Sequence, residues 1–196
     1  MKPLEEIYKG GFFKGRHRLD WRKEYVCEGV RVAFNMVEGS SVIDVGCAIG
    51  EYVKYFREAF HFIAAGIEGS EAAIPFLVTD GIHILDLREK LPSFLPRFTV
   101  CISLEVAEHI EPEYAEQYVD NLVGLSDQIL ITAAKPGQGG HHHVNCQMPR
   151  YWEAKFFRRG FHRSHLREDM FKEILSPMSH RKELNVYRQN VMIFRK

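Results

Sequence analysis

The sequence predicts an α/β fold, in which helices cover both faces of a parallel β-sheet. Short β-branched segments alternate with segments whose apolar residues recur every three or four positions. The predicted strands are almost entirely apolar, as expected for strands buried on both faces. With 196 residues, 45% of them hydrophobic, the chain suits one domain with a sizeable core, and we expect a single domain over residues 1–196.

The first half of the chain predicts two helices and three strands. Apolar residues at helical spacing mark residues 24–37, where Gly39 is expected to end the helix, and residues 50–60. The three predicted strands are short apolar runs that lead to a glycine or an acidic residue. They cover residues 41–45, 61–67 and 81–85.

The second half continues the alternation. A fourth strand is predicted at residues 98–103, before a charged helix at residues 112–125. After a fifth strand comes a loop rich in glycine and histidine, and then a helix whose aromatic residues we assign to the core. The remaining elements are a strand at 128–132, the loop at 136–149, the helix at 151–159 and a closing strand at 190–194.

Several classes of protein are disfavoured by composition. Membrane spans are not expected, because no run approaches the roughly 18 apolar residues that one needs. Residues 1–6 carry charge without an apolar stretch behind it, so we expect no secretory signal. The four cysteines include no Cys-x-x-Cys pair, which is typical of reduced thiols in a cytoplasmic protein.

The net charge of zero hides an uneven distribution. Residues 32–149 carry 6 basic and 16 acidic side chains, whereas both flanks are basic. A modestly anionic substrate is therefore compatible with the sequence if the flanks border it. The basic excess is too dispersed to predict a nucleic-acid surface.

Acidic residues end three of the predicted strands. They are Asp44, Glu68 and Asp86, and the first precedes a glycine turn that contains Gly46 and Gly50. Ligands of open α/β sheets bind beyond the carboxyl ends of the strands. A glycine turn lets the backbone approach a ligand closely, and an acid that ends the next strand can accept both hydroxyls of a ribose. The arrangement predicts a nucleoside-binding site.

On these residues the sequence resembles the class I S-adenosylmethionine (SAM)-dependent methyltransferases. Their first motif is Asp/Glu-x-Gly-x-Gly-x-Gly, and residues 44–50 match it except that Ala48 replaces the middle glycine. Residues 103–110 resemble the motif at the family's fourth strand. The resemblance implies a Rossmann-like, doubly wound sheet of seven mostly parallel strands, the last one antiparallel.

The resemblance also implies SAM as the cofactor. Glu68 would bind the ribose, and Asp86 with Leu87 would lie at the adenine edge. The predicted cofactor-binding residues are Asp44, Gly46, Cys47, Gly50, Glu68, Asp86, Leu87 and Leu104. An ordinary strand–helix turn is the simpler alternative. A nicotinamide cofactor is disfavoured because the acid precedes the turn, whereas dinucleotides need glycines that cradle a pyrophosphate.

The segment after the fourth predicted strand supplies the first candidate for the acceptor site. It contains Glu105, Glu108 and His109 as Glu-x-x-Glu-His. We predict that Glu105 binds substrate and that His109 is catalytic. The pattern also resembles the metal-binding motif of small-RNA 2′-O-methyltransferases, and a purely structural role is a further alternative.

The loop after the fifth predicted strand supplies the second candidate. We predict His143 as a catalytic base and His141 and Asn145 as substrate-binding residues, because similar loops occur in small-molecule methyltransferases. In an extended loop His141 and His143 would share a side while His142 faces away. His-x-His could also ligate zinc or iron with Cys146 or Glu105, but no metal is assigned.

The segment before the first predicted helix is rich in aromatic and basic residues. We expect residues 1–22 either to cover the cofactor as a lid or to form a surface arm. The side chains that suggest a lid are Tyr8, Phe12, Phe13, His17, Arg18 and Trp21.

The leading functional prediction is methyl transfer from SAM to oxygen or nitrogen of a small molecule, such as a sugar or secondary metabolite. A nucleic-acid partner is disfavoured because so short a chain leaves little room for a recognition domain. The sequence does not predict the oligomeric state. The alternatives are a metal-assisted RNA ribose 2′-O-methyltransferase and a non-catalytic SAM-fold binding protein.

Overall fold

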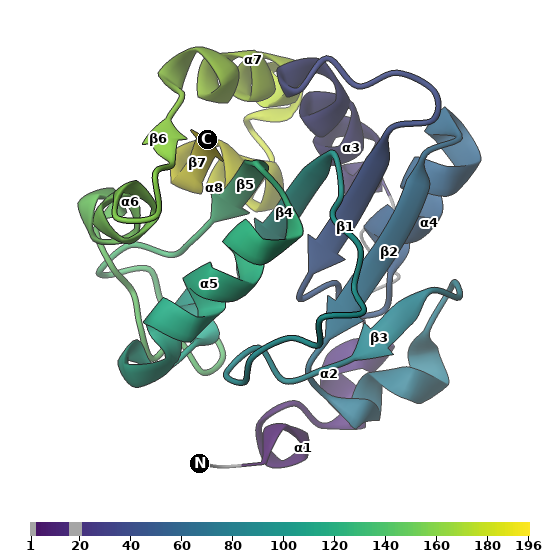
Figure 1. The fold of residues 1–196 in the computed structure, drawn as a ribbon. Coiled ribbons are helices and arrows are strands. Elements are labelled where there is room, and N and C mark those ends of the chain that lie inside the picture. The colour runs from purple at the N-terminus through teal and green to yellow at the C-terminus, as the bar shows by residue number, and fades with distance from the viewer. Residues whose placement is uncertain (1–2, 16–20) are drawn as a thin grey trace.

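A seven-stranded sheet forms the centre of the computed structural model, which describes residues 3–15 and 21–196 (Figure 1). The strands are β1 (Ser41–Val45), β2 (Ile63–Glu68), β3 (Ile82–Ile84), β4 (Val100–Leu104), β5 (Gln128–Thr132), β6 (His162–Arg163) and β7 (Val191–Arg195). Their order is β3-β2-β1-β4-β5-β7-β6. The pairs among β1 to β5 are parallel, and β7 is antiparallel to both β5 and β6. The predicted fold class is therefore confirmed.

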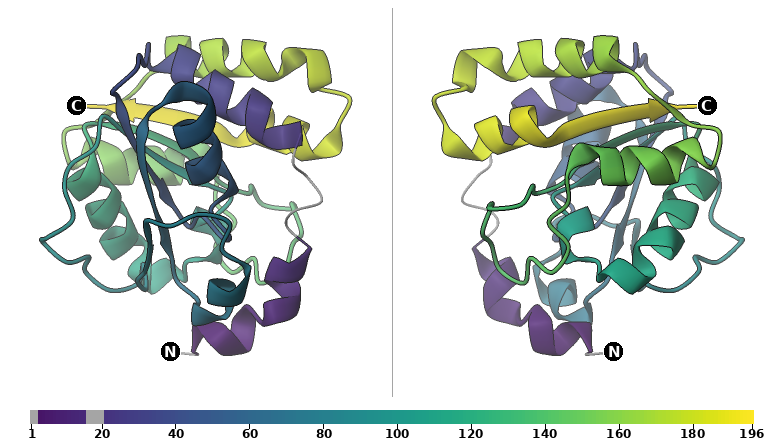
Figure 2. Two further views of the ribbon diagram at one scale, coloured as in Figure 1. Left: turned by 90° about the vertical axis from the view of Figure 1, so that its right-hand side faces the viewer. Right: turned by 90° about the vertical axis from the view of Figure 1, so that its left-hand side faces the viewer.

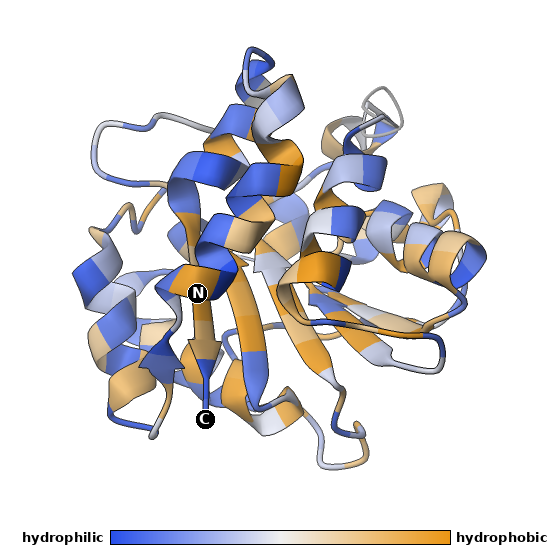
Figure 3. Cartoon of the chain, turned by 90° about the horizontal axis from the view of Figure 1, so that it is seen from above, coloured by the Kyte–Doolittle hydropathy of each residue, from blue (hydrophilic) through white to orange (hydrophobic). Residues whose placement is uncertain are grey.

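Helices cover both faces of this sheet. The helices of the described residues are α1 (Leu4–Ile7), α2 (Gly10–Lys14), α3 (Trp21–Ala33), α4 (Glu51–Phe60), α5 (Ala115–Leu125), α6 (Pro149–Phe157), α7 (His165–Leu175) and α8 (Lys182–Asn190). Residues of α3, α4, α7 and α8 pack on one face, and those of α5 and α6 pack on the other. Figure 3 shows hydrophobic strands inside helices that carry many hydrophilic residues. Short 3₁₀ turns cover Glu71–Phe76, Ala107–His109, Pro112–Tyr114 and Ser176–Met178.

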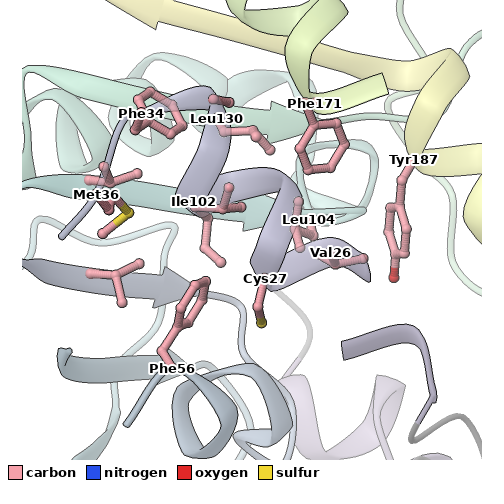
Figure 4. Close-up of a cluster of buried hydrophobic side chains, with 14 of the residues drawn as sticks. Val26, Cys27, Phe34, Met36, Phe56, Ile102, Leu104, Leu130, Phe171 and Tyr187 are labelled. Carbon is pink, nitrogen blue, oxygen red and sulfur yellow. The ribbon is translucent and has the colours of Figure 1, made fainter. Parts of the chain in front are cut away.

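Successive strand residues supply two different cores. Val42 packs with the α3 side of the sheet, whereas its neighbour Ile43 packs with the α5 side, because side chains alternate along a strand. Figure 4 shows the first cluster, where Phe56, Leu130 and Phe171 come together from α4, β5 and α7. Burying such a side chain contributes roughly 1.5–3 kcal/mol to the stability of the fold. The two clusters therefore fix the helices to the sheet and hold its strands in place.

Several predicted boundaries differ from the structure by a few residues, and two of them, at the end of α3 and at the start of β2, share one physical reason. The helix predicted at residues 24–37 ends at Ala33, because Asn35 adopts a left-handed backbone (φ 52°) and Met36 N–H bonds to the Arg31 carbonyl. Val37 is consequently 70% exposed. The second strand begins at Ile63 and not at residue 61, because His61 caps α4 with φ 55°. Non-glycine residues with positive φ ended both helices, a choice that apolar periodicity does not reveal.

Residues 160–189 contain elements that the sequence analysis did not predict: β6, α7 and α8. Helix α7 packs closely against α3, where a Cβ on Gly29 would lie 2.8 Å from the Phe171 ring. A glycine inside a helix can mark such a close approach, and this signal was available in the sequence. Figure 2 shows α1 and α2 at the opposite end of the molecule from α7 and β7. No helix in the described ranges is long and apolar enough to cross a membrane.

Candidate active site at the carboxyl ends of the strands

A cavity of about 370 Å³ lies where β1, β2 and β4 end. Predicted cofactor and acceptor residues share its wall. They are Gly46, Glu68, Asp86, Leu87, Leu104, Glu105, His109, His141 and His143. A smaller cavity of about 80 Å³ shares Gly46 and Leu104 with it and is lined by Asp44 and Cys47.

Two predicted site residues line neither cavity. Gly50 ends the glycine turn as the N-cap of α4, with φ 84°, and a Cβ there would meet Thr79 and Ile82 and not a cavity. Asn145 is buried and its Oδ1 accepts a hydrogen bond from Gln147 Nε2 at 3.0 Å. Asn145 therefore holds its loop from within and does not face either cavity.

The glycine turn after β1 is fixed by backbone geometry. The N–H groups of Gly46 and Cys47 both donate to the Ile67 carbonyl, at 2.7 and 2.9 Å. Gly46 has φ 84°, and a Cβ there would overlap with Val106 on the neighbouring segment. Glycine is therefore required at this position for both conformation and space.

Ala48, which replaces the middle glycine of the motif, adopts a left-handed backbone with φ 51°. This conformation aims its N–H at Glu68 Oε2, 2.9 Å away. The departure from the motif thus costs backbone strain in addition to space. Ala48, Glu105 and His142 all have positive φ and all line the larger cavity, and strain of this kind clusters at functional sites.

Glu68 ends β2 with both carboxylate oxygens positioned. Oε2 accepts from Ala48 N–H, and Oε1 accepts from Ser70 N–H at 3.0 Å. This carboxylate lines the larger cavity. Asp86 is held differently, because the buried Arg88 guanidinium donates to both of its oxygens at 2.6 to 3.0 Å.

The smaller cavity combines opposite charges. Asp44 Oδ2 and Arg22 Nε are both buried and have no hydrogen-bond partner among the described residues. Burial, with the nearby Glu68 carboxylate, raises the pKa of Asp44 to about 8. One carboxyl oxygen and one guanidinium N–H, both buried without a partner among the described residues, fit a ligand group that carries an ammonium and a carboxylate.

The segment after β4 places two carboxylates side by side. Glu105 accepts from Asn190 Nδ2 at 3.2 Å and has φ 54°. Glu108 is 0% exposed, and burial followed by the Glu105 charge raises the pKa of Glu108 to about 8, against the opposing effect of nearby backbone N–H groups. Neither Glu108 oxygen has a hydrogen-bond partner of ordinary geometry in the described structure.

The histidine loop, residues 137–147, docks on this segment through backbone bonds. Val144 N–H and Asn145 N–H both donate to the Glu108 carbonyl at 2.9 Å. His109 Nδ1 lies 3.1 Å from the His142 carbonyl. The His109 and His143 rings consequently meet edge to face with centroids 4.8 Å apart.

The expected orientation of the loop histidines was wrong. All three of them line the larger cavity, because residues 141–142 form a turn in which His142 has φ 54°. The loop is therefore not extended, and side chains do not alternate there. His141 Nε2 lies 2.9 Å from the Ile7 carbonyl, whereas His143 Nδ1 lies 3.1 Å from the Gln138 carbonyl.

The N-terminal segment also borders the larger cavity. Leu4, Ile7, Tyr8 and Phe12 line it, and Phe13 is buried beside Ile49. The predicted residues His17 and Arg18 lie outside the described part of the chain, and Trp21 opens α3. The basic N-terminal flank thus gives apolar side chains to the larger cavity, and Arg22 and Lys23 to the smaller one.

Sequence reasoning missed several residues that line the two cavities or support them. The residues that were not predicted as part of the site are Arg22, Ala48, Arg88, Glu108, His142 and Tyr187. Arg88, two residues after a strand-end acid, could have been recognised as its partner. Tyr187 gives no local signal, because only the packing of α8 brings it to the cavities.

Comparison with known proteins agrees with this architecture. A search of curated proteins found no matching relative. Among solved structures, magnesium protoporphyrin IX methyltransferase from Synechocystis PCC 6803 with bound S-adenosylhomocysteine (SAH) superposes with a TM-score of 0.57 and 18% identity, over 74% of each chain. The sugar N-methyltransferase KedS8 from Streptoalloteichus sp ATCC 53650 gives 0.60 and 17%, over 78% of this chain and 84% of that one.

A third structure, the plantazolicin methyltransferase BpumL with SAH, gives a TM-score of 0.59 and 13% identity, over 92% of this chain and 84% of that one. Such identities show the fold alone. The resemblance to class I SAM-dependent methyltransferases is confirmed at that level, and SAM remains the cofactor that agrees with it. A family model matches residues 28–148, more than half of the chain. The chain belongs to the family described as methionine biosynthesis protein MetW.

Proposed function

We propose that this protein transfers the methyl group of SAM to an oxygen or nitrogen atom of a small molecule. The observation that carries the proposal is the smaller cavity, where Asp44 Oδ2 and Arg22 Nε are buried without partners. An α-amino-acid group carries an ammonium and a carboxylate, which match these two charges. The methionine end of SAM is such a group.

The larger cavity suits the remainder of the cofactor. Glu68 lines this cavity with its carboxylate positioned by the N–H groups of Ala48 and Ser70, and a carboxylate at a strand end suits the hydroxyls of a ribose. Leu87 and Leu104 offer apolar surface on the same wall. Gly46 and Leu104 line both cavities, so one ligand can extend across them.

His143 is the candidate base for the acceptor. Its Nδ1 faces the Gln138 carbonyl, which can only accept, so Nδ1 carries the proton and Nε2 presents a lone pair. SAM supplies an activated sulfonium methyl, so the protein has only to align the acceptor and remove its proton. General base catalysis contributes roughly 10²–10⁴-fold.

A small acceptor is supported by the size and boundary of the site. A cavity of about 370 Å³ is in the range of small-molecule pockets. Leu4, Ile7, Tyr8 and Phe12 border it, which supports the role of a lid for the N-terminal segment. The family description also names methionine biosynthesis, which is small-molecule metabolism.

Titration calorimetry with SAM tests the cofactor site. Glu68→Ala should abolish SAM binding, because the variant loses the acceptor of the ribose hydroxyls and the anchor of Ala48 N–H. Glu89→Ala, which changes an exposed carboxylate nearby, should bind like the wild type. Unchanged SAM affinity in Glu68→Ala would overturn the assignment.

Transfer of a tritiated methyl group from SAM into fractions of a cell extract tests the reaction. Counts should enter the low-molecular-weight fraction, and His143→Ala should lower them about 10²–10⁴-fold while SAM affinity is unchanged. His83→Ala, on β3, is the matched control. Counts in RNA or protein would contradict a small acceptor, and SAM binding without transfer would favour a non-catalytic protein.

A further inference from the structure

A buried carboxylate and two imidazoles meet on one wall of the larger cavity. Glu108 is fully buried, and both of its oxygens lack a hydrogen-bond partner among the described residues. Leaving a buried carboxyl group in that state is costly, because it has lost water without gaining a hydrogen-bond partner. Buried polar groups of native proteins are ordinarily compensated, so this carboxyl group points to a ligand that binds its oxygens.

The two histidines beside Glu108 are oriented by backbone carbonyls. His109 Nδ1 faces the His142 carbonyl, and His143 Nδ1 faces the Gln138 carbonyl, each at 3.1 Å. Since a carbonyl only accepts, both Nδ1 atoms carry the proton, and both rings have the tautomer with the lone pair on Nε2. Metal-binding histidines are held in this way, by a second nitrogen that donates to a carbonyl or carboxylate.

The spacing of these groups suits one shared ion. His143 Nε2 lies 4.0 Å from Glu108 Oε1, which is too long for a hydrogen bond. Two atoms that each bind an ion at about 2.0–2.2 Å lie roughly 3–4 Å apart. One ligand atom from each of Glu108, His109 and His143 falls within 4.8 Å of the others, so small side-chain rotations bring all three to bonding distance.

We propose that Glu108, His109 and His143 bind a divalent ion of the first transition row, such as Zn²⁺, Fe²⁺ or Co²⁺. Two imidazoles and one carboxylate favour these ions over Mg²⁺ and Ca²⁺, which prefer oxygen ligands. The sequence analysis assigned no metal but gave the Glu-x-x-Glu-His pattern as a metal-binding alternative, and the proposed site shares Glu108 and His109 with that pattern. It differs from the His-x-His alternative, because His141 is engaged with the N-terminal segment.

Three protein ligands leave coordination positions open toward the cavity. An oxygen or nitrogen of the acceptor can occupy one of them, and this part of the inference rests on the proposed methyl transfer. With the ion bound, His143 Nε2 would bind the metal and could not take up the acceptor proton. The ion would instead lower the pKa of the coordinated acceptor, which would release its proton to water before the methyl group is transferred.

A pair of neighbouring glycines gives a matched test. A Cβ on Gly140 would overlap with the His143 imidazole, whereas a Cβ on Gly139 would have no atom within 4 Å. Gly140→Ala should therefore displace His143 without removing any ligand. Gly139→Ala makes the same chemical change one residue earlier and should leave the ring in place.

The experiment titrates chelator-treated protein with Co²⁺ and follows the visible absorption of the bound ion and the heat of binding. The wild type should bind one Co²⁺ per chain. Glu108→Gln, His143→Ala and Gly140→Ala should each lower the affinity, by at least about 100-fold for the two lost ligands. Gly139→Ala and His141→Ala should bind Co²⁺ like the wild type.

The proposal is overturned if the wild type does not bind Co²⁺ stoichiometrically, or if Gly140→Ala and Gly139→Ala bind it equally well. Loss of binding in His141→Ala instead of His143→Ala would also overturn it. Circular dichroism shows whether each variant is folded, and Gly139→Ala keeps the comparison valid if Glu108→Gln does not fold. SAM binding measured on the same samples is a separate readout, so failure of the cofactor site is distinguishable from failure of the metal site.

Discussion

The two halves of the site are built in different ways. The glycine-turn half, residues 44–50 with Glu68, consists of a continuous motif and the end of the adjacent parallel strand. The histidine half, Glu108 and His109 with the histidine loop, joins segments that follow β4 and β5. Its register depends on two backbone bonds to one carbonyl, that of Glu108.

This difference shows how each half tolerates change. The turn is held by the β1–β2 ladder and by the two N–H groups that donate to the Ile67 carbonyl. Its conformation is therefore set by hydrogen bonds to the backbone of the adjacent strand. The loop depends on side-chain space, such as the missing Cβ of Gly140 against His143. Val106 lies between the halves, since it contacts Gly46 and precedes Glu108 by two residues.

Gly46→Ala should have the largest effect on stability, because it pushes the glycine turn against Val106 in the segment that carries Glu108. The added Cβ would overlap with Val106 at a left-handed position. Backbone strain and overpacking together should cost about 2–4 kcal/mol of unfolding free energy, measured by urea denaturation. Gly39→Ala is the control, because Gly39 also has positive φ but open space, so its cost should be that of strain alone. Equal costs would show that Val106 does not couple the halves.

Asp44→Asn tests the electrostatics of the glycine-turn half. The pKa of Asp44 is raised to about 8, whereas an unfolded aspartate has a pKa of about 3.9. Between these values the native state binds a proton that the unfolded state has released, so stability falls as pH rises through this window. Asp44 should contribute a slope of up to about 1.4 kcal/mol per pH unit between them.

The comparison of Asp44→Asn with the wild type is made without SAM, by denaturation at several pH values. The variant should lose this part of the slope, and other titrating groups cancel in the difference. Asp169→Asn, at an exposed position of α7, should keep the wild-type slope. A variant slope equal to that of the wild type would mean that Asp44 is ionised throughout.

Ala48→Gly should have the smallest effect on stability, and it tests whether the glycine-turn half can change without affecting the histidine half. Glycine relieves the left-handed strain at φ 51°, and the gain is partly offset by the entropy of the unfolded chain. The net stabilisation should be about 0.5–1 kcal/mol, with Co²⁺ affinity unchanged because the histidine half is not touched. Ala154→Gly on α6 should have the opposite sign, since glycine weakens a helix. If Ala48→Gly lowers the free energy of unfolding, the left-handed backbone of Ala48 is not strained.

Much of the glycine-turn half could be predicted from the sequence. Asp44 lines the smaller cavity, Glu68 the larger one and Gly46 both, and their places follow from strand ends and a glycine turn that adjacent residues encode. Arg22, which faces Asp44 in the smaller cavity, was not predicted, since its position depends on how α3 packs. The histidine half was predicted by residue type, but the orientation of His142 and the burial of Glu108 were not.

The sequence by itself determined the alternation of strands and helices, the glycine turn and the acids that end β1 and β2, because each depends on residues within one turn or strand. Only the tertiary structure decided which polar atoms were left without partners and which imidazoles faced Glu108. The closing helices α7 and α8 and the left-handed residues Asn35 and His61 belong to the same group. These features depend on burial and on contacts between distant segments, and such contacts form only when the whole sheet is assembled.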